Sequence, residues 1–223
     1  MSQKISFNDR YGLTQAVLNG TKTMTRRLEK GLQRGIVEYE KMYHETFNFN
    51  TEYQSWGSTI NKLVIGAPHA TLYLPTRYKL GEIVAVAQAY KDIEEYNPKS
   101  YEDVMLDQGT ICESSHPYSH LMKSGGWDNK MFVRADLMPH QIQITGVRIE
   151  RLQAISYEDC IKEGIVEHMD SRGYCYYYVK GMDGWFHSPH EAFATLINRP
   201  GVGCKGLWES NPWVVVYQFK LVK

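Results

Sequence analysis

The clearest alternation of hydrophobic and polar positions lies near the C-terminus of the chain. Large apolar side chains occupy every second position there, at Trp213, Val215, Tyr217, Phe219 and Leu221. The polar residues Gln218 and Lys220 lie between the last of them. Because side chains on a strand alternate between its two faces, this segment predicts a strand with one large apolar face.

Two earlier segments also predict strands. Residues 82–90 are apolar on both faces, which is typical of a buried strand. In residues 142–152, Ile142 and Ile144 share one parity, whereas Val147 and Ile149 take the opposite parity. Gly146 lies at the change, and a glycine at such a position predicts a β-bulge.

Short helices are predicted at two places. Residues 8–18 have apolar positions on one helical face, with Asn8 or Asp9 as the N-cap. A second helix follows Ser156, which can act as an N-cap with Asp159 three residues later. It ends at Gly164, because glycine readily takes the left-handed conformation that follows a helix.

The remaining segments are polar, rich in aromatic residues and weakly periodic. They predict insertions at about residues 30–77, 91–130 and 166–205 in a single domain that covers residues 1–223. Several strands with few, short helices favour a mixed α/β (α+β) fold around a small closed or partly closed β-barrel.

Composition narrows the possible classes of protein. A length of 223 residues with 43% hydrophobic residues allows one substantial core. Lys+Arg and Asp+Glu balance at 25 each, so bulk charge gives no general attraction to nucleic acid. Apolar runs fall short of the ~20 residues of a membrane span. The start of the chain, residues 1–4, does not resemble a secretory signal.

The cysteines do not suggest a disulfide framework. They show no tight paired spacing and are found at Cys112, Cys160, Cys175 and Cys204. We therefore expect a cytoplasmic protein with reduced thiols, without a membrane partner or an obligate protein partner.

Candidate chemistry is concentrated in residues 19–28, Asn-Gly-Thr-Lys-Thr-Met-Thr-Arg-Arg-Leu. Lys22 and Thr25 would face opposite sides of a flat strand, so they can meet only if the backbone turns between them. A lysine beside a threonine hydroxyl is a possible nucleophile–activator pair, because a neutral amine can take the hydroxyl proton. The alternative is a basic edge segment with solvated charges.

Glu163 is the next candidate. It lies in the last turn of its predicted helix, where the macrodipole disfavours a carboxylate and favours its neutral form. Such a group suits a proton donor and acceptor. The alternative is a solvated surface glutamate paired with a nearby base.

Four stretches in order resemble the activating-signal-cointegrator homology (ASCH) family, whose fold is similar to the PUA RNA-binding barrel. Residues 20–27, Gly-Thr-Lys-Thr-Met-Thr-Arg-Arg, look like its signature. Residues 78–84 resemble its Gly-Asp/Glu-then-strand element, and residues 143–165 resemble its central strand and following helix. Residues 211–219 resemble its closing strand. Together these stretches cover about half of the chain.

The resemblance implies a candidate activity. Some small bacterial members of the family resemble amidohydrolases that remove the acyl group from acetylcytidine with a lysine, a threonine and a glutamate, which align with Lys22, Thr25 and Glu163. Thr25 would attack the amide carbonyl, Lys22 would accept its proton, and Glu163 would pass protons to the leaving amine. A neutral Lys22 needs its pKa to fall by about 3, through burial or a cationic neighbour such as Arg26 or Arg27.

Other residues are expected to contact the ligand rather than react. These substrate- or RNA-binding candidates are Thr23, Arg26, Arg27 and Gln88. Related sequences often carry an acidic residue where this chain has Gln88, which can read a base edge but cannot transfer protons. The chain is also much longer than the compact amidohydrolases, so its insertions could reshape the pocket.

Two other functions fit the same residues. The first is a binding module that recognises RNA or a nucleotide without turnover, and the second is RNA cleavage. A local basic patch favours binding and comprises Lys22, Arg26, Arg27, Lys30 and Arg34. Rings that could stack on bases, or pack an insertion, occur at Tyr174, Tyr176, Tyr177, Tyr178, Trp185 and Phe186.

No metal or cofactor is expected. Cys112, His116 and His120 recur at every fourth residue, which would align them on a helix. Pro117 breaks such a helix, so we expect a loop at this place.

Overall fold

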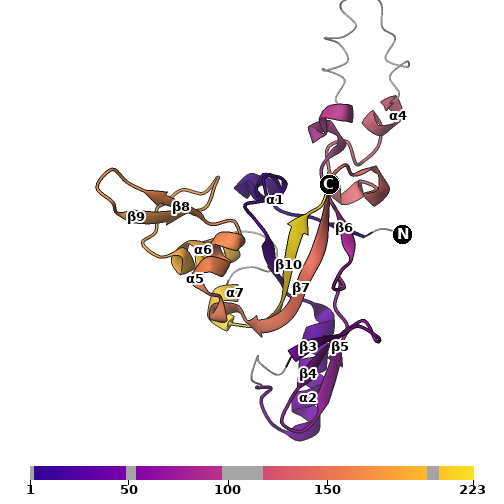
Figure 1. Ribbon diagram of the computed structural model, residues 1–223, viewed down its shortest axis with the longest axis vertical. Coiled ribbons are helices and arrows are strands. Elements are labelled where there is room, and N and C mark those ends of the chain that lie inside the picture. Colours follow the sequence, from indigo (N-terminus) through magenta and orange to yellow (C-terminus); the bar gives the residue numbers. More distant parts are fainter. Residues whose placement is uncertain (1–2, 49–53, 97–117, 200–205) are drawn as a thin grey trace, which may run out of the picture. The chain divides into compact units, whose positions relative to one another are not determined.

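The computed structural model describes residues 3–48, 54–96, 118–199 and 206–223, which divide into two compact units (Figure 1). Unit 1 comprises residues 1–8, 83–142 and 222–223, and unit 2 comprises residues 9–82 and 143–221. Strand β7 (Gln141–Arg151) begins in unit 1 and continues in unit 2. The single-domain organisation predicted from the sequence stays a prediction.

Unit 1 is built on β1 (Lys4–Ile5) and β6 (Ile83–Val86). The two strands are parallel, with Lys4 opposite Ala85, and the amide of Val86 donates to the carbonyl of His140 just before β7. Short helices follow β6: η2 (Tyr90–Asp92), η3 (Glu94–Tyr96), α4 (Ser119–Met122), η5 (Lys130–Phe132) and η6 (Ala135–Leu137). Apolar side chains from this segment, among them the buried Tyr90 and Tyr96, form a core cluster of this unit.

The sheet of unit 2 has the order β7-β10-β2, with β10 (Trp213–Leu221) in the middle (Figure 1). Strand β2 (Met24–Arg27) is antiparallel to β10, and Thr25 is the register partner of Tyr217. The predicted strand at the C-terminus is confirmed, because β10 has the expected bounds and Val216 and Tyr217 are fully buried.

The two predicted helices of this unit are present, but the N-cap of the first α-helix is Gly12 and not the expected Asn8 or Asp9. The first is a 3₁₀ turn, η1 (Asp9–Tyr11), followed by α1 (Leu13–Leu18). The second is α5 (Tyr157–Lys162), which follows a 3₁₀ turn, η7 (Leu152–Ala154), and begins at Ser156, whose hydroxyl accepts from the Asp159 amide at 3.2 Å. Gly164 follows α5 with φ +104°, as expected for a glycine at a helix end.

Residues 30–77, predicted as a weakly periodic insertion, form regular structure instead. Helix α2 (Lys30–Tyr43) is followed by the antiparallel strands β3 (Gln54–Gly57), β4 (Lys62–Gly66) and β5 (Thr71–Leu74). The helix buries Leu32, Ile36 and Tyr39 along one face. Two glycines, Gly31 and Gly35, interrupt the apolar pattern, so hydrophobic periodicity did not predict this helix.

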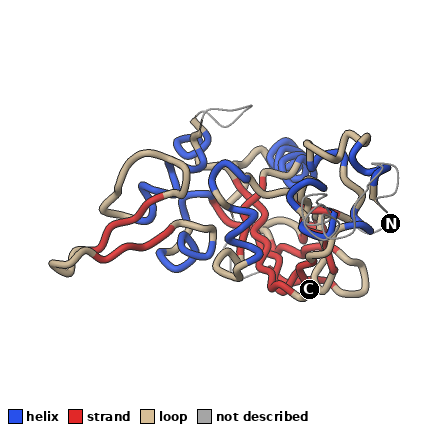
Figure 2. Tube along the Cα trace, turned by 90° about the horizontal axis from the view of Figure 1, so that it is seen from above, coloured by secondary structure: helices blue, strands red, loops and turns tan. Residues whose placement is uncertain are grey.

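A second segment of unit 2 lies beyond α5. It consists of β8 (Val166–Met169), β9 (Cys175–Tyr178), α6 (Pro189–Ile197) and α7 (Leu207–Ser210). Strands β8 and β9 form an antiparallel ribbon that runs out from α5 and α6 (Figures 1 and 2). This segment corresponds to the third predicted insertion.

The fold class is therefore mixed α/β, as predicted. Within the described part of the chain the strands form open ladders, and no ladder closes into a barrel. Strand β7 continues through Gly146, and the β-bulge expected there stays a prediction. A Cβ at Gly146 would lie 2.6 Å from Oε1 of Gln218, so close approach of β10 explains the glycine. No helix of the described residues is both long enough and apolar enough to cross a membrane.

Candidate functional site

Lys22 is held in place by the turn that ends α1. Gly20 takes a left-handed conformation with φ +72°, and the backbone amides of Thr21 and Lys22 both donate to the carbonyl of Ala16. The next amide, that of Thr23, donates to the carbonyl of Lys162 in α5. The sequence thus bends the chain before β2 and ties the bend to the helix that carries Glu163.

The amine of Lys22 is saturated with acceptors. Its Nζ donates to Oε2 of Glu163 at 2.7 Å, to the carbonyl of Glu163 at 2.6 Å and to the carbonyl of Met24 at 2.7 Å. An ammonium group has three protons, so these acceptors account for all of them. Lys22 is 2% exposed. Burial lowers the pKa of Lys22, and the charge of Glu163 opposes this shift.

Arg26 connects Glu163 to two further carboxylates. It donates to Oε1 of Glu163 at 3.1 Å, to Oε1 of Glu150 at 2.5 Å and 2.8 Å, and to Oδ2 of Asp159 at 3.0 Å. Arg148 completes the network, at 2.6 Å from Asp159 and 3.1 Å from Glu150. Three cations and three carboxylates therefore balance in this buried network.

Within this network, the opposite charges stabilise one another's ionised forms. Burial disfavours the cation of Arg26, but Glu163 and Glu150 outweigh it and raise the pKa of Arg26. Burial likewise disfavours the carboxylate of Asp159, but the hydrogen bond from Arg26 and the charge of Arg148 lower the pKa of Asp159.

Thr25 lies on the other face of β2. Lys22 and Arg26 both reach Glu163, and Met24 shares their face because its sulfur accepts from Arg26. Side chains alternate along a strand, so Thr25 points the opposite way, beside its register partner Tyr217. The structure thus brings Lys22 and Glu163 together, whereas Thr25 lies on the face of β2 opposite to Met24 and Arg26. The catalytic roles proposed for the three residues stay predictions.

Of the other predicted binding residues, Arg27 is close enough to Lys22 and Glu163 for their charges to interact, whereas Gln88 belongs to the other unit. Arg27 lies on the face of Thr25, and burial lowers the pKa of Arg27. Thr23 is half-buried at the bend before β2. Gln88 belongs to unit 1, where its Oε1 lies 2.7 Å from Nδ1 of His140.

Sequence reasoning missed the acidic partners of Arg26. Asp159 was interpreted only as part of a helix cap, and neither Glu150 nor Arg148 was singled out. Arg148 and Glu150 share one face of β7, two residues apart. That spacing was the available signal, although it does not indicate that β2 lies in the same sheet, on the far side of β10.

The predicted basic patch divides into two parts. Lys22 and Arg26 are neutralised in the buried network, whereas Lys30 and Arg34 are exposed on α2. These two line a cavity of about 580 Å³ beside the start of the helix. Its described lining consists of Leu28, Glu29, Lys30, Gln33, Arg34, Leu207 and Pro212.

The aromatic cluster of the third insertion lies on the β8–β9 ribbon. Trp185 contacts Tyr178 and His168, with ring centroids 4.8 Å and 5.2 Å apart, and is 58% exposed. On the other face, Tyr177 and Tyr157 share hydrogen bonds with Glu167. These rings pack mainly against one another.

The possible metal ligands Cys112 and His116 lie outside the described residues, as does Cys204. Among the residues that the structure does describe, no group of three or more His, Cys, Asp or Glu side chains is arranged to hold a metal ion. Comparisons of the chain with protein families, with curated proteins and with solved structures find no match.

Proposed function

We propose that this protein binds a nucleotide or RNA ligand without hydrolysing it, and that the ligand's phosphate occupies the cavity at the start of α2. The carrying observation is a pair of cations, Lys30 and Arg34, that line this cavity and form no ion pair with any described residue. They lie one helical turn apart, so both ammonium and guanidinium can face the same anion.

Two further features favour an anion there. The first turn of α2 adds the positive end of the helix dipole. Of the described residues that line the cavity, only Glu29 carries a carboxylate. It is engaged by the hydroxyl of Tyr217 and by the amide of Arg77, and burial raises the pKa of Glu29. Both of its carboxylate oxygens therefore already accept a hydrogen bond from within the protein.

Hydrolysis of an acylated nucleoside is the second candidate, favoured by the contact between Lys22 and Glu163. It ranks second because a general base must be free of its proton and close to the nucleophile. Lys22 instead donates to three acceptors, and Thr25 lies on the opposite face of β2. The buried network thus supports a structural role for Lys22.

We further infer an ASCH-type, PUA-like barrel as the core of this protein, in a cytoplasmic setting. Three of the four stretches that resemble the family form neighbouring elements of unit 2, namely β2, β7 with α5, and β10. The fourth contributes β6. This adjacency supports the barrel, whose closure would require strands to pair beyond the open ladders of the described residues.

The experiment is a titration of a fluorescent single-stranded oligoribonucleotide at several salt concentrations. Lys30→Ala and Arg34→Ala should each weaken binding and lower the salt slope by about 1. Lys41→Ala is the matched control, since Lys41 is exposed on the same helix but lines neither cavity. Equal losses in all three variants, or no RNA binding by the wild type, would contradict the proposal.

A parallel assay tests the second candidate. The protein is incubated with acetylcytidine, and deacylation is followed by chromatography for the wild type and for Thr25→Ala. We expect no turnover by either protein. Turnover that requires Thr25 would establish hydrolysis and refute the proposal that the protein binds its ligand without hydrolysing it.

A further inference from the structure

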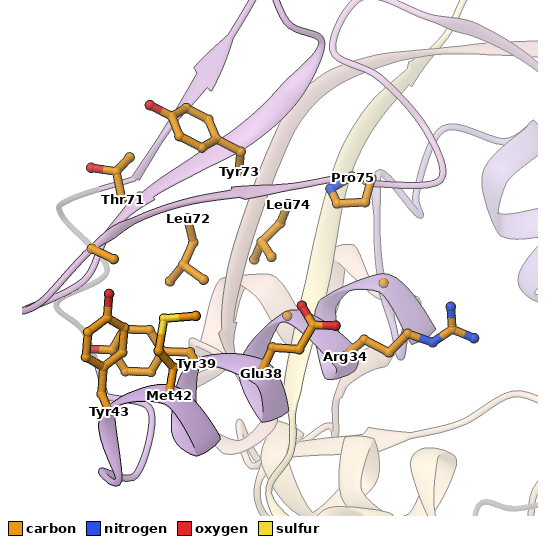
Figure 3. A pocket seen from close by; sticks show the side chains of 13 residues that line it. Arg34, Glu38, Tyr39, Met42, Tyr43, Thr71, Leu72, Tyr73, Leu74 and Pro75 are labelled. Atoms are coloured by element: carbon orange, nitrogen blue, oxygen red, sulfur yellow. The ribbon is translucent and has the colours of Figure 1, made fainter.

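A second cavity, of about 450 Å³, lies between α2 and β5 (Figure 3). Two glycines let helix and strand approach closely on one side of it. A Cβ at Gly35 would lie 2.5 Å from Cδ2 of Leu74, and one at Gly31 would lie 3.2 Å from the carbonyl oxygen of Pro75. The groove is therefore built into the packing of these two elements and does not depend on a single loop.

The side chains that line the groove change along α2 from charged to apolar and aromatic. Arg34 and Glu38 lie toward one end, and Tyr39, Met42 and Tyr43 lie toward the other (Figure 3). From the opposite wall, the apolar side chains of Leu72 and Leu74 point toward the helix. The charged end and the apolar–aromatic end thus belong to one continuous lining.

The charged end is available for a ligand. Arg34 and Glu38 are both exposed, and neither forms an ion pair with a described residue. They do not pair with each other, in keeping with the weaker of the two orientations for opposite charges four residues apart, with the acid C-terminal to the base. Arg34 also lines the first cavity, so one side chain is common to both.

We propose that this groove binds the nucleoside part of a ribonucleotide whose phosphate is held by Arg34. This inference rests on the proposed phosphate site. Glu38, about 6 Å further along the helix axis, accepts hydrogen bonds from the ribose hydroxyls. The base lies between Leu72 and Met42, beside the ring of Tyr43. The order along α2, cation then carboxylate then apolar and aromatic groups, matches the order phosphate, ribose, base.

Each contact suits its part of the ligand. A guanidinium offers paired donors to phosphate oxygens. A carboxylate accepts from vicinal hydroxyls, which a deoxyribose lacks in part. The aliphatic side chains of Leu72 and Met42 can pack on the faces of any base, so the groove selects a ribonucleotide over a sugar phosphate without selecting strongly among bases.

The test is calorimetric titration of the full chain with ribonucleoside 5′-monophosphates, their 2′-deoxy forms and ribose 5-phosphate. We expect ribonucleotides to bind at least about tenfold more tightly than ribose 5-phosphate, equivalent to about 1.4 kcal/mol. Met42→Ser should remove most of this advantage and leave ribose 5-phosphate binding unchanged. Val37→Ser is the matched control, because Val37 is exposed on the same helix and does not line the groove.

A second variant tests the ribose contact. Glu38→Gln should reduce the preference for ribo- over deoxyribonucleotides while the folded protein keeps its urea midpoint. Equal affinity of wild type for nucleotides and for ribose 5-phosphate would overturn the groove assignment and leave the phosphate site standing. Failure of every phosphate compound to bind would overturn both.

Discussion

The buried charge network predicts that replacing one carboxylate by an amide of the same shape will cause a large loss of stability. Glu163→Gln keeps the shape of the side chain and removes the negative charge that faces Lys22 and Arg26. These two cations are 2% and 1% exposed in their side chains, and Glu163 is 6% exposed. Water therefore cannot replace the lost carboxylate.

The magnitude follows from the cost of an unpaired buried charge. Removing one partner of such a pair costs about 3–5 kcal/mol of unfolding free energy. The amide oxygen of glutamine still accepts one hydrogen bond, so we expect a loss near the lower end, about 3 kcal/mol. With a urea slope of about 1–3 kcal/mol per molar, the midpoint should fall by about 1–3 M.

Urea unfolding followed by tryptophan fluorescence provides the assay. Lys162→Gln is the control, because Lys162 lies 3.6 Å from Asp159 at the exposed rim and should change stability by less than about 1 kcal/mol. The double variant Lys22→Met with Glu163→Gln restores charge balance and should lose less than the sum of its two single variants. A loss below about 1 kcal/mol for Glu163→Gln would show that the network is solvated and refute the argument.

Three other predictions concern stability. Ser156→Ala removes the cap of α5 and should cost about 1 kcal/mol in urea unfolding; no change would mean that another group caps the helix. Gly164→Ala should destabilise more than Gly173→Ala: both have positive φ, but only at Gly164 would the new Cβ crowd another group, Cδ2 of Leu13 at 2.9 Å. Equal losses would show that backbone conformation alone decides. Burial raises the pKa of Cys160 from 9.0 to about 12, so the native state holds the thiol proton more tightly. The resulting stability is complete below pH 9 and declines as the pH rises from about 9 toward 12. Urea midpoints measured from pH 8 to pH 10.5 should therefore fall less steeply in Cys160→Ala than in wild type, and parallel curves would contradict this.

Features encoded by neighbouring residues could be predicted from the sequence. The alternation of β10, the cap at Ser156 and the left-handed Gly164 each depend on a few consecutive positions, and all three are present. Helix α2 was not predicted because it contains Gly31 and Gly35, which have low helix propensity. These glycines allow close packing of the helix against β5 and Pro75. The helical structure of this segment is thus determined by tertiary packing and not by the local helix propensity of its residues.

The candidate site was predictable only in part. The sequence marked Glu163 as a carboxylate at an unfavourable helix end, and the structure pairs it with two cations, Arg26 on β2 and Lys22 at the bend before β2. The partners Glu150 and Asp159 could not be inferred, because their meeting with Arg26 depends on how β2, β7 and α5 pack. Ion pairs between residues far apart in the sequence produce no periodic pattern from which they could be predicted in a single sequence.

The separation of Lys22 and Glu163 by 141 residues sets an order of events during synthesis. At about 5–20 residues per second, a ribosome needs roughly 7–28 s to add the residues between them. Until then Lys22 and Arg26 cannot pair with Glu163, and β2 cannot pair with β10, which is made later still. The N-terminal part of unit 2 therefore lacks these partners until the later part of the same unit has been made.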